Sequence, residues 1–268
     1  MVAGIFYADN QEVLIKNVDD ALLAARSLNK IAVNSRPCAI LSPHAAFEYS
    51  GRIQAAAWAQ IDSPIDRVII IAPIRQRGES AAYLPESEVF QTPLGDVNVD
   101  TEVCSELESC NTLFVTNDIP HLESHSIEVQ LPFMHRLFPE AMLVPVLVSG
   151  DTRVVSALAR AIDLVLGEEM ETTLVVASSN LASSMVSGIA ERGSDDLLAS
   201  IYSNDWRRVS GALDIGGSVA IASAMALSTV QGSRFKLLMR IDSRHHRAPV
   251  NEKIVHYCAG AWLKESVS

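Results

Sequence analysis

The sequence is poor in features that mark several common protein classes. Its 268 residues include only four cysteines, which lie far apart and never form a CxxC pair. This spacing favours reduced, packed thiols over a disulfide framework or a zinc knuckle. Basic residues are also few, because 21 lysines and arginines face 32 aspartates and glutamates, which gives a net charge of −11. Such a charge repels phosphate groups, so nucleic acids and anionic membranes are disfavoured as partners.

Long apolar runs and dividing segments are missing as well. No apolar stretch reaches the roughly 18 residues that a membrane span needs, and the first residues carry no basic leader. We therefore expect a cytoplasmic protein. No Pro/Gly/Ser-rich linker, tandem repeat or low-complexity tract interrupts the chain, so residues 1–268 are expected to form a single domain. A hydrophobic content of 49% suits a substantial buried core.

Short apolar runs alternate with helical patterns, which predicts an α/β fold with a central, mostly parallel or mixed sheet flanked by helices. Strands are expected at 2–8, 38–41, 68–72, 113–115, 141–148, 172–177, 235–241 and 254–262, with a β-hairpin within 83–99. Helices are expected at 13–28, 51–61, 101–107, from a cap at Asp151 to about 166, at 194–212 as a pair, and at 218–230. The last two strands have no helix between them, which favours antiparallel or mixed pairing. Pro145 should limit the pairing of its strand on one side.

Polar loops follow three of the predicted strands. His44 follows the strand at 38–41, Arg75 and Gln76 follow the strand at 68–72, and Asn180 and Ser183 follow the strand at 172–177. In open α/β sheets, ligands bind in a crevice at the carboxyl ends of the strands. We therefore expect these loops to surround a binding crevice.

The densest set of titratable groups lies in residues 121–132. Pro120 is expected to keep the preceding backbone extended, so that a helix begins near Ser124. His121, His125 and Glu128 could then line one edge of the crevice. The alternative is a capped amphipathic helix whose histidines only make hydrogen bonds. A second histidine-containing segment, residues 244–247 (Arg-His-His-Arg), is interpreted as a solvated turn because adjacent side chains point apart.

Four segments carry a family resemblance. Residues 2–7 read V-A-G-I-F-Y, residues 43–51 read P-H-A-A-F-E-Y-S-G, residues 92–97 read T-P-L-G-D-V, and residues 125–132 read H-S-I-E-V-Q-L-P. Together they are similar to the motifs A-G-x-F-Y, P-H-A-G-Y-x-Y-S-G, T-P-L-G and E-H-S-[IL]-E-x-x-L-P of the Memo family, which includes the B component of the AmmeMemoRadiSam system. The resemblance implies a single α/β domain related to the LigB-like class III extradiol dioxygenases, which are non-haem iron enzymes.

The metal site that this resemblance implies is mostly absent. The family pattern would use His44, a histidine in G-P-S-H, a cysteine in C-G-x-x-P-I and a histidine in S-S-D-x-x-H. Here residues 72–76 read A-P-I-R-Q, residues 178–183 read S-S-N-L-A-S, and Leu213 falls where the cysteine is expected. One imidazole is too few ligands for a divalent transition metal, and the guanidinium of Arg75 repels a cation.

We therefore expect the fold and the crevice to persist without a resident cofactor. The exception would be a rebuilt site for iron, copper or zinc near His44, with ligands drawn from His121, His125, Glu128 or Asp214.

The sequence is compatible with three functions. The first is a non-catalytic protein that binds a small carboxylate or other anionic ligand, and this interpretation leaves room for a protein partner or a homodimer. The residues expected to line its pocket are His44, Tyr49, Arg75, Gln76, His121, His125, Glu128, Asn180, Ser183 and Asp214. The second is an iron-dependent oxidoreductase of extradiol-dioxygenase type, with His44, His125 and Glu128 as candidate catalytic residues. The third is a metal-free hydrolase using Ser178, Ser179 or Ser183, although no G-x-S-x-G elbow surrounds them.

Overall fold

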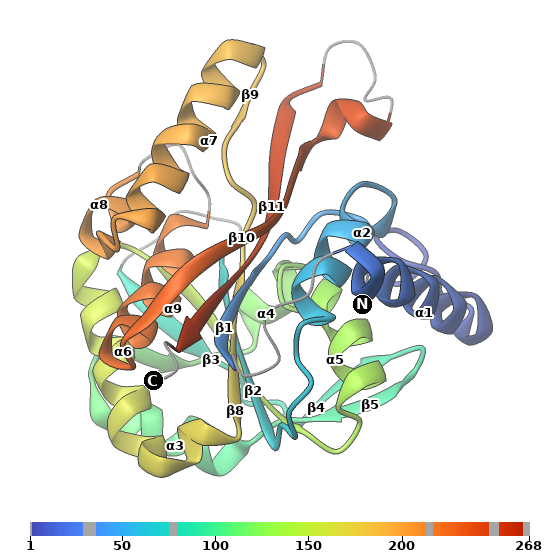
Figure 1. The fold of residues 1–268 in the computed structure, drawn as a ribbon. Helices are drawn as coiled ribbons and strands as arrows, with labels where there is room; N and C mark the ends of the chain where they lie inside the picture. The colour runs from blue at the N-terminus through green and yellow to red at the C-terminus, as the bar shows by residue number, and fades with distance from the viewer. Residues whose placement is uncertain (1, 29–35, 75–79, 213–216, 247–251, 265–268) are drawn as a thin grey trace.

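A nine-stranded mixed sheet forms the centre of the molecule in the computed structural model, which describes residues 2–28, 36–74, 80–212, 217–246 and 252–264 (Figure 1). The strand order is β10-β11-β1-β8-β2-β7-β3-β6, and β9 pairs with β11 outside this path. The strands are β1 (Pro37–Ser42), β2 (Arg67–Pro73), β3 (Ala81–Leu84), β6 (Phe114–Thr116), β7 (Met142–Ser149), β8 (Thr173–Ser178), β9 (Ser183–Ser184), β10 (Ser233–Asp242) and β11 (Ile254–Lys264). The predicted α/β domain with a mixed, largely parallel sheet is confirmed.

The four central strands are parallel, with β1 beside β8, β8 beside β2 and β2 beside β7. Every residue of β1 and β8 is buried, as are Val68, Ile69, Ile70, Ile71 and Ala72 of β2. Strands that are covered on both faces read as continuous apolar runs, which is why these runs could be recognised in the sequence. The carboxyl ends of all four strands meet at one edge of the sheet.

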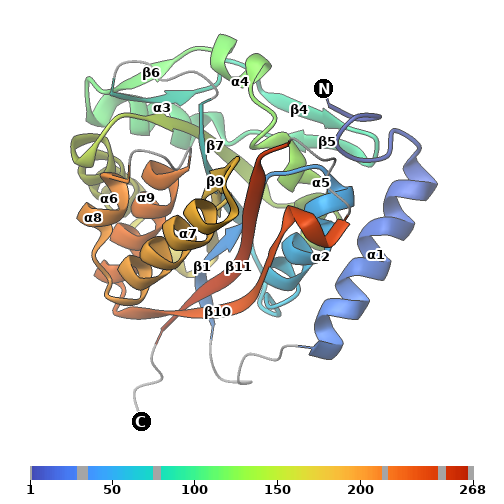
Figure 2. The ribbon, with the colours of Figure 1, turned by 90° about the horizontal axis from the view of Figure 1, so that it is seen from above.

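Helices cover both faces of the sheet (Figures 1 and 2). One face carries α3 (Thr101–Cys110), α6 (Thr152–Leu166), α7 (Ser187–Tyr202), α8 (Trp206–Ser210) and α9 (Ser218–Val230). The other carries α1 (Gln11–Leu28), α2 (Phe47–Trp58), α5 (Leu131–Leu137) and a separate hairpin of β4 (Val89–Thr92) and β5 (Gly95–Asn98). Two apolar clusters result, one on each face, and they bury the alternate sides of the same strands.

The last two strands, β10 and β11, are antiparallel to their neighbours, as expected from the sequence. β10 pairs with β11 and β11 with β1 in antiparallel register, as predicted for strands without a connecting helix. Pro145 of β7 faces Ile70 of β2, whereas β3 pairs with β7 only at residues 147–149. Because proline donates no hydrogen bond, the second partner strand begins beyond it.

Several predicted elements are wrong in place or kind. Residues 2–8 form a turn rather than a strand, because Gly4 adopts a positive φ of 79° and its N–H donates to the Tyr7 carbonyl at 2.7 Å. The helix expected at 51–61 is α2, which already begins at Phe47, and the first of the pair expected at 194–212 is α7, which begins at Ser187. Extra turns of helix at an N-terminus are easily missed where no strong cap marks the start.

The helix expected near Ser124 is also wrong. Ile119–Glu123 form a short helix, α4, and Ser124 ends it with extended backbone. A 3₁₀ turn, η1 (Glu128–Gln130), then leads into α5 at Leu131. Pro120 lies in the first turn of α4, where its missing N–H costs nothing, so it starts a helix rather than preventing one.

The remaining 3₁₀ turns, η2 (Gly167–Glu171) and η3 (Ser243–His246), lie at opposite ends of the sheet. η3 includes the first three residues of the segment interpreted as a solvated turn, and Arg247 lies outside the described residues. Among the described helices, none is both long enough and apolar enough to cross a membrane.

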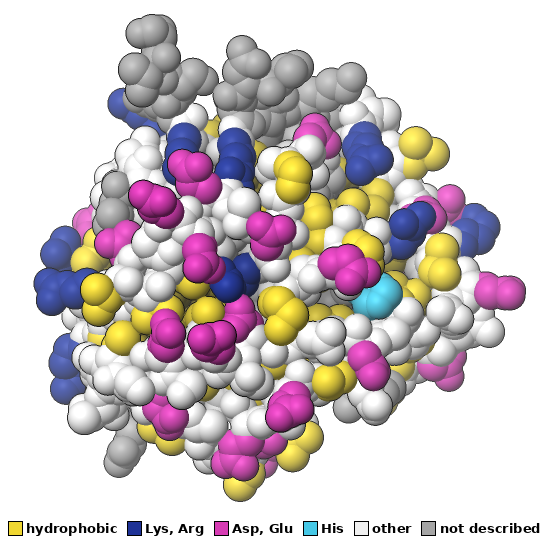
Figure 3. All heavy atoms as spheres, turned by 90° about the horizontal axis from the view of Figure 1, so that it is seen from below, with side chains coloured by type: hydrophobic (Ala, Val, Ile, Leu, Met, Phe, Trp, Pro, Cys, Tyr) yellow, Lys and Arg dark blue, Asp and Glu magenta, His cyan; other side chains and the backbone are white. Residues whose placement is uncertain are grey.

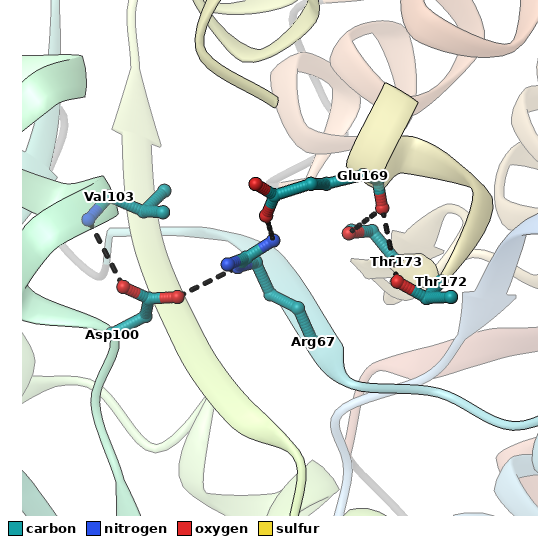
Figure 4. A network of polar contacts seen from close by, with 6 residues as sticks. All are labelled: Arg67, Asp100, Val103, Glu169, Thr172 and Thr173. Atoms are coloured by element: carbon teal, nitrogen blue, oxygen red, sulfur yellow. Dashed lines mark hydrogen bonds and ion pairs between the residues drawn. The ribbon is translucent and has the colours of Figure 1, made fainter. Parts of the chain in front are cut away.

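An arginine ties together the amino edge of the sheet, opposite the crevice loops (Figure 4). Arg67 Nε donates to Asp100 Oδ2 at 2.8 Å, and its Nη1 donates to Glu169 Oε2 at 2.7 Å. Asp100 also caps α3 by accepting from the Val103 N–H. The arginine side chain is only 15% exposed, so its charge is neutralised where solvent is scarce. Seen from this side, the surface carries many acidic groups, which agrees with the net negative charge (Figure 3).

Close packing at Gly260 gives a test of the β10–β11 pairing. A Cβ at this position would lie 2.2 Å from Cζ of Phe235, whose ring packs against Trp262. We expect Gly260→Ala to lower the free energy of unfolding by about 1–3 kcal/mol in denaturant titrations. Gly51→Ala is the control, because a Cβ there meets only Phe47 at 3.5 Å and alanine favours helix α2. Equal effects of the two substitutions would contradict the register.

Candidate functional site

A buried amide organises the carboxyl edge of the sheet. Gln130, at the end of η1, is fully buried. Its Oε1 accepts from Ser42 Oγ at 2.8 Å and from Trp58 Nε1 at 3.0 Å. Its Nε2 donates to the Pro43 carbonyl at 2.8 Å and to Ser178 Oγ at 3.0 Å. All four hydrogen-bonding positions of the amide are therefore used, and η1 is fastened to the ends of β1 and β8.

His44 lies just beyond the end of β1, as the sequence predicted. Its backbone N–H donates to Asn180 Oδ1 at 3.2 Å, and its Nδ1 lies 3.1 Å from the Ser178 carbonyl oxygen. A carbonyl can only accept, so the proton is on Nδ1 and the lone pair is on Nε2. Burial and the nearby His125 lower the pKa of His44 to about 4, so its imidazole is neutral at pH 7.

His125 is brought beside His44 by the segment between α4 and η1. The two imidazole rings lie edge to face with centroids 5.9 Å apart. The other neighbour of His125 is Phe6, whose ring stacks on it with centroids 4.2 Å apart. The N-terminal turn of residues 2–7 therefore forms one wall of the site, although the sequence patterns gave it the role of a strand.

Glu128 is held by the same N-terminal turn. Its Oε1 accepts from the Val2 N–H at 2.5 Å and from the Tyr7 hydroxyl at 2.8 Å. Burial and the Glu128 carboxylate raise the pKa of the Tyr7 hydroxyl, so tyrosine remains a donor at all ordinary pH values. This carboxylate thus anchors the chain next to His125.

The other predicted pocket residues are scattered. His121 Nε2 lies 3.2 Å from the Tyr83 carbonyl and its ring contacts Phe90, on the β3–β4 side of the molecule. Tyr49 faces His246 of η3, with ring centroids 6.3 Å apart, and Ser183 is an exposed residue of β9. The structure thus brings together His44, His125 and Asn180, with Glu128 behind them. Arg75, Gln76 and Asp214 lie outside the described residues.

The serines proposed as nucleophiles have structural partners. Ser178 Oγ is fully buried, donates to the Ser126 carbonyl at 2.6 Å and accepts from Gln130. Ser179 Oγ donates to the Asn180 carbonyl at 2.7 Å. Neither hydroxyl hydrogen points to an imidazole base, which a serine nucleophile needs. These contacts disfavour the hydrolase interpretation at both positions.

Few of the described side chains at this edge of the sheet could coordinate a metal ion. In the part of the chain that the structure describes, no three His, Cys, Asp or Glu side chains are grouped so that they could hold an ion. His44 has the orientation of a metal ligand, because a backbone carbonyl fixes its Nδ1–H and leaves Nε2 available. His121 has the same arrangement with its ring nitrogens exchanged, since its Nε2 faces the Tyr83 carbonyl and its Nδ1 has no partner among the described residues, but it lies on the β3–β4 side of the molecule. The described residues therefore do not fit a three-ligand transition-metal site.

Four important residues of the site were missed in the sequence: Phe6, Tyr7, Ser126 and Gln130. All four lie inside motifs that carry the family resemblance, which was the available signal. Residue type alone did not reveal them, because a phenylalanine or glutamine is usually a packing or surface residue.

Replacement of the central amide should be costly. Gln130→Met roughly keeps the volume but removes the hydrogen-bond partner of Trp58, Ser42, the Pro43 carbonyl and Ser178. We expect the free energy of unfolding to fall by about 3–5 kcal/mol in denaturant titrations. The control is Gln54→Met, since Gln54 is equally buried but makes two hydrogen bonds, through Nε2 alone. Losses of the same size would show that Gln130 has no special role.

The low histidine pKa values predict acid sensitivity. Burial lowers the pKa of His121, like that of His44, to about 4, against 6.5 for an ordinary histidine. Between these values the unfolded chain binds more protons than the folded one. The stability that these neutral histidines contribute is therefore fully present above pH 6.5. It is lost as the pH falls from 6.5 to about 4, and it does not change further below that pH. His256, whose pKa burial also lowers, contributes in the same direction. Asp118, Asp151 and Asp242 have lowered pKa values, so the stability that they contribute is lost at lower pH than that of the histidines.

We expect His121→Gln to remove on the order of 2 kcal/mol of the stability difference between about pH 7 and about pH 4.5. Denaturant titrations of wild type and variant at both pH values measure it. Parallel pH dependences in the two proteins would contradict the prediction.

Comparison with known proteins places the chain in a family. Residues 1–260 match the sequence profile of the family described as Memo-like protein. A MEMO1 family protein of Methanobrevibacter smithii is 34% identical over 191 residues, which is 68% of this chain and 67% of the relative. Another, of Thermoplasma volcanium, is 29% identical over 252 residues, or 90% of each chain. A third, of Thermotoga sp., is 31% identical over 77% of each chain. The fold, the four matching motifs and these relatives together show that this protein belongs to the Memo-like family.

Proposed function

We propose that this protein is a non-catalytic member of the Memo-like family that binds a small carboxylate ligand, without a metal ion, in the crevice beside His44. The observation that carries the proposal is the hydrogen-bonding capacity that the polar side chains beside His44 leave for a ligand. His44 is neutral, so its Nε2 lone pair accepts a hydrogen bond from a hydroxyl group of the ligand, such as that of lactate, and the ligand carboxylate is left to donors around it. The neighbouring carboxylate of Glu128 is occupied by Val2 and Tyr7.

Hydrogen-bond donors are also available. Asn180 uses its Oδ1 to accept from His44, and its Nδ2 group has no protein partner among the described residues, so it can donate to an anion. Arg75 follows Pro73, the last residue of β2, by two positions in the sequence. The Pro73 carbonyl accepts from Ser126 at 3.0 Å, which places the end of β2 next to the His125 segment. A guanidinium supplied from this loop suits a carboxylate better than a cation.

An iron-dependent oxidoreductase of extradiol-dioxygenase type is the second candidate. One observation favours it: the carbonyl that fixes Nδ1–H of His44 is the arrangement that orients imidazole ligands in metalloproteins. Two further ligands would be required, and the nearest described candidates are His125 and Glu128, the second of which already binds the N-terminal turn.

Ligand screening and metal analysis separate the two candidates. We expect small carboxylates such as acetate, lactate or succinate to raise the melting temperature, and Arg75→Ala or Asn180→Ala to weaken this shift at least about five-fold in ligand concentration. Arg160→Ala is the control, because this exposed arginine lies on α6. We also expect purification without chelator to give far less than one iron, copper or zinc per chain.

Stoichiometric metal that disappears in His44→Ala, with oxygen uptake on adding catechol and ferrous iron, would replace the binding proposal with the oxidoreductase. Carboxylate shifts that persist unchanged in Arg75→Ala and Asn180→Ala would place the ligand elsewhere.

A further inference from the structure

A second pocket lies away from His44, between α7, α8 and β9. Its volume is about 350 Å³, which is within the range of small-molecule sites. Ser183 lines it, so this residue, which the sequence placed in the His44 pocket, belongs to a different cavity. None of the residues that contact His44 in the described structure lines this second pocket.

The inner surface of the pocket is apolar. Leu197 of α7 is 2% exposed and Val209 of α8 is fully buried, and both line the cavity. Gly193 lets α7 pack closely against Ala182, because a Cβ at position 193 would lie 3.2 Å from the Ala182 Cβ. Ile189 lines the pocket although half of its side chain is exposed to solvent. A ligand with an apolar side chain would remove the exposed part of Ile189 from water.

Two opposite charges also line the pocket and are not engaged by the protein. Asp196 comes from α7 and Arg208 from α8. Among the described residues, neither the carboxylate nor the guanidinium forms an ion pair or a hydrogen bond, with each other or with a third group.

Three charged groups near them have partners within the protein. Asp195 binds Arg240 at 2.6 Å, the Asp205 carboxylate caps α8, and Arg207 stacks over the Trp206 ring at 4.3 Å. These three neighbours are thus engaged within the protein, whereas Asp196 and Arg208, which carry opposite charges, line the same cavity. This arrangement is complementary to a small zwitterion with an apolar body.

We propose that this pocket binds a free α-amino acid with an apolar side chain, such as leucine. The ligand carboxylate pairs with Arg208, the ammonium group pairs with Asp196, and the side chain packs on Ile189. The Ser183 hydroxyl, which has no protein partner in the described structure, is a further hydrogen-bond donor or acceptor for the ligand. The inference is independent of the proposed function at His44.

Titration of the full chain with L-leucine, followed by calorimetry and by NMR of the ligand, tests the site. We expect saturable binding, and at least about ten-fold weaker binding of isoamylamine and of isocaproate, which each lack one of the two charges. Glycine, which lacks the apolar body, should bind at least about ten-fold more weakly as well.

Variants assign the binding to this pocket. Asp196→Asn and Arg208→Gln should each weaken leucine binding at least about ten-fold, because each removes one charge pair. Both side chains are exposed, so the substitutions spare the core, and circular dichroism confirms folding. Glu191→Gln and Arg192→Gln, both on α7 and outside the pocket lining, are the controls for removal of one acid and one base, and should leave the affinity within about two-fold.

His44→Ala separates this proposal from the previous one, since it should abolish carboxylate binding at the sheet edge and leave leucine binding unchanged. Absence of saturable leucine binding up to about 10 mM would overturn the inference. So would binding that survives both Asp196→Asn and Arg208→Gln, or binding that is lost with His44→Ala.

Discussion

The side-chain amide of Gln130 is the contact on which the carboxyl edge of the sheet depends. This amide has no access to solvent, donates two hydrogen bonds and accepts two. Its partners lie in β1, α2 and β8 and at Pro43, the residue directly after β1. In a low-dielectric interior, each of these groups would be expensive to leave unpaired. Because Ser178 belongs to this network and its carbonyl fixes the His44 ring, the orientation of the histidine follows from the placement of the glutamine.

The central architecture could be predicted because it rests on residue patterns. The runs at β1, β2, β7 and β8 are apolar on both faces, and such runs suit parallel strands covered by helices. The position of Pro145 even predicted the limited pairing of β7. Helix starts were less predictable. Pro120 and Pro132 each lie in the first turn of a helix, although Pro120 was expected to keep the preceding backbone extended.

The site could be predicted only where residues follow directly from a strand end. His44 and Asn180 are neighbours because β1 and β8 are parallel and adjacent. His121 and His125 are close in sequence, yet the end of α4 at Ser124 sends them to different surroundings. Patterns could not place Phe6 beside His125 either, since that contact depends on a turn at Gly4 and on tertiary packing.

Glu128 and its partner Val2 are 126 positions apart along the chain, and the partners of Gln130 extend from Ser42 to Ser178. During synthesis the turn leaves the ribosome long before the carboxylate that will hold it exists. The crevice can close only after β8 has emerged, so nearly two thirds of the polypeptide must be available before its walls meet. Contacts of such high sequence separation form late and slowly, which makes this edge of the sheet one of the last regions of the nascent protein to mature.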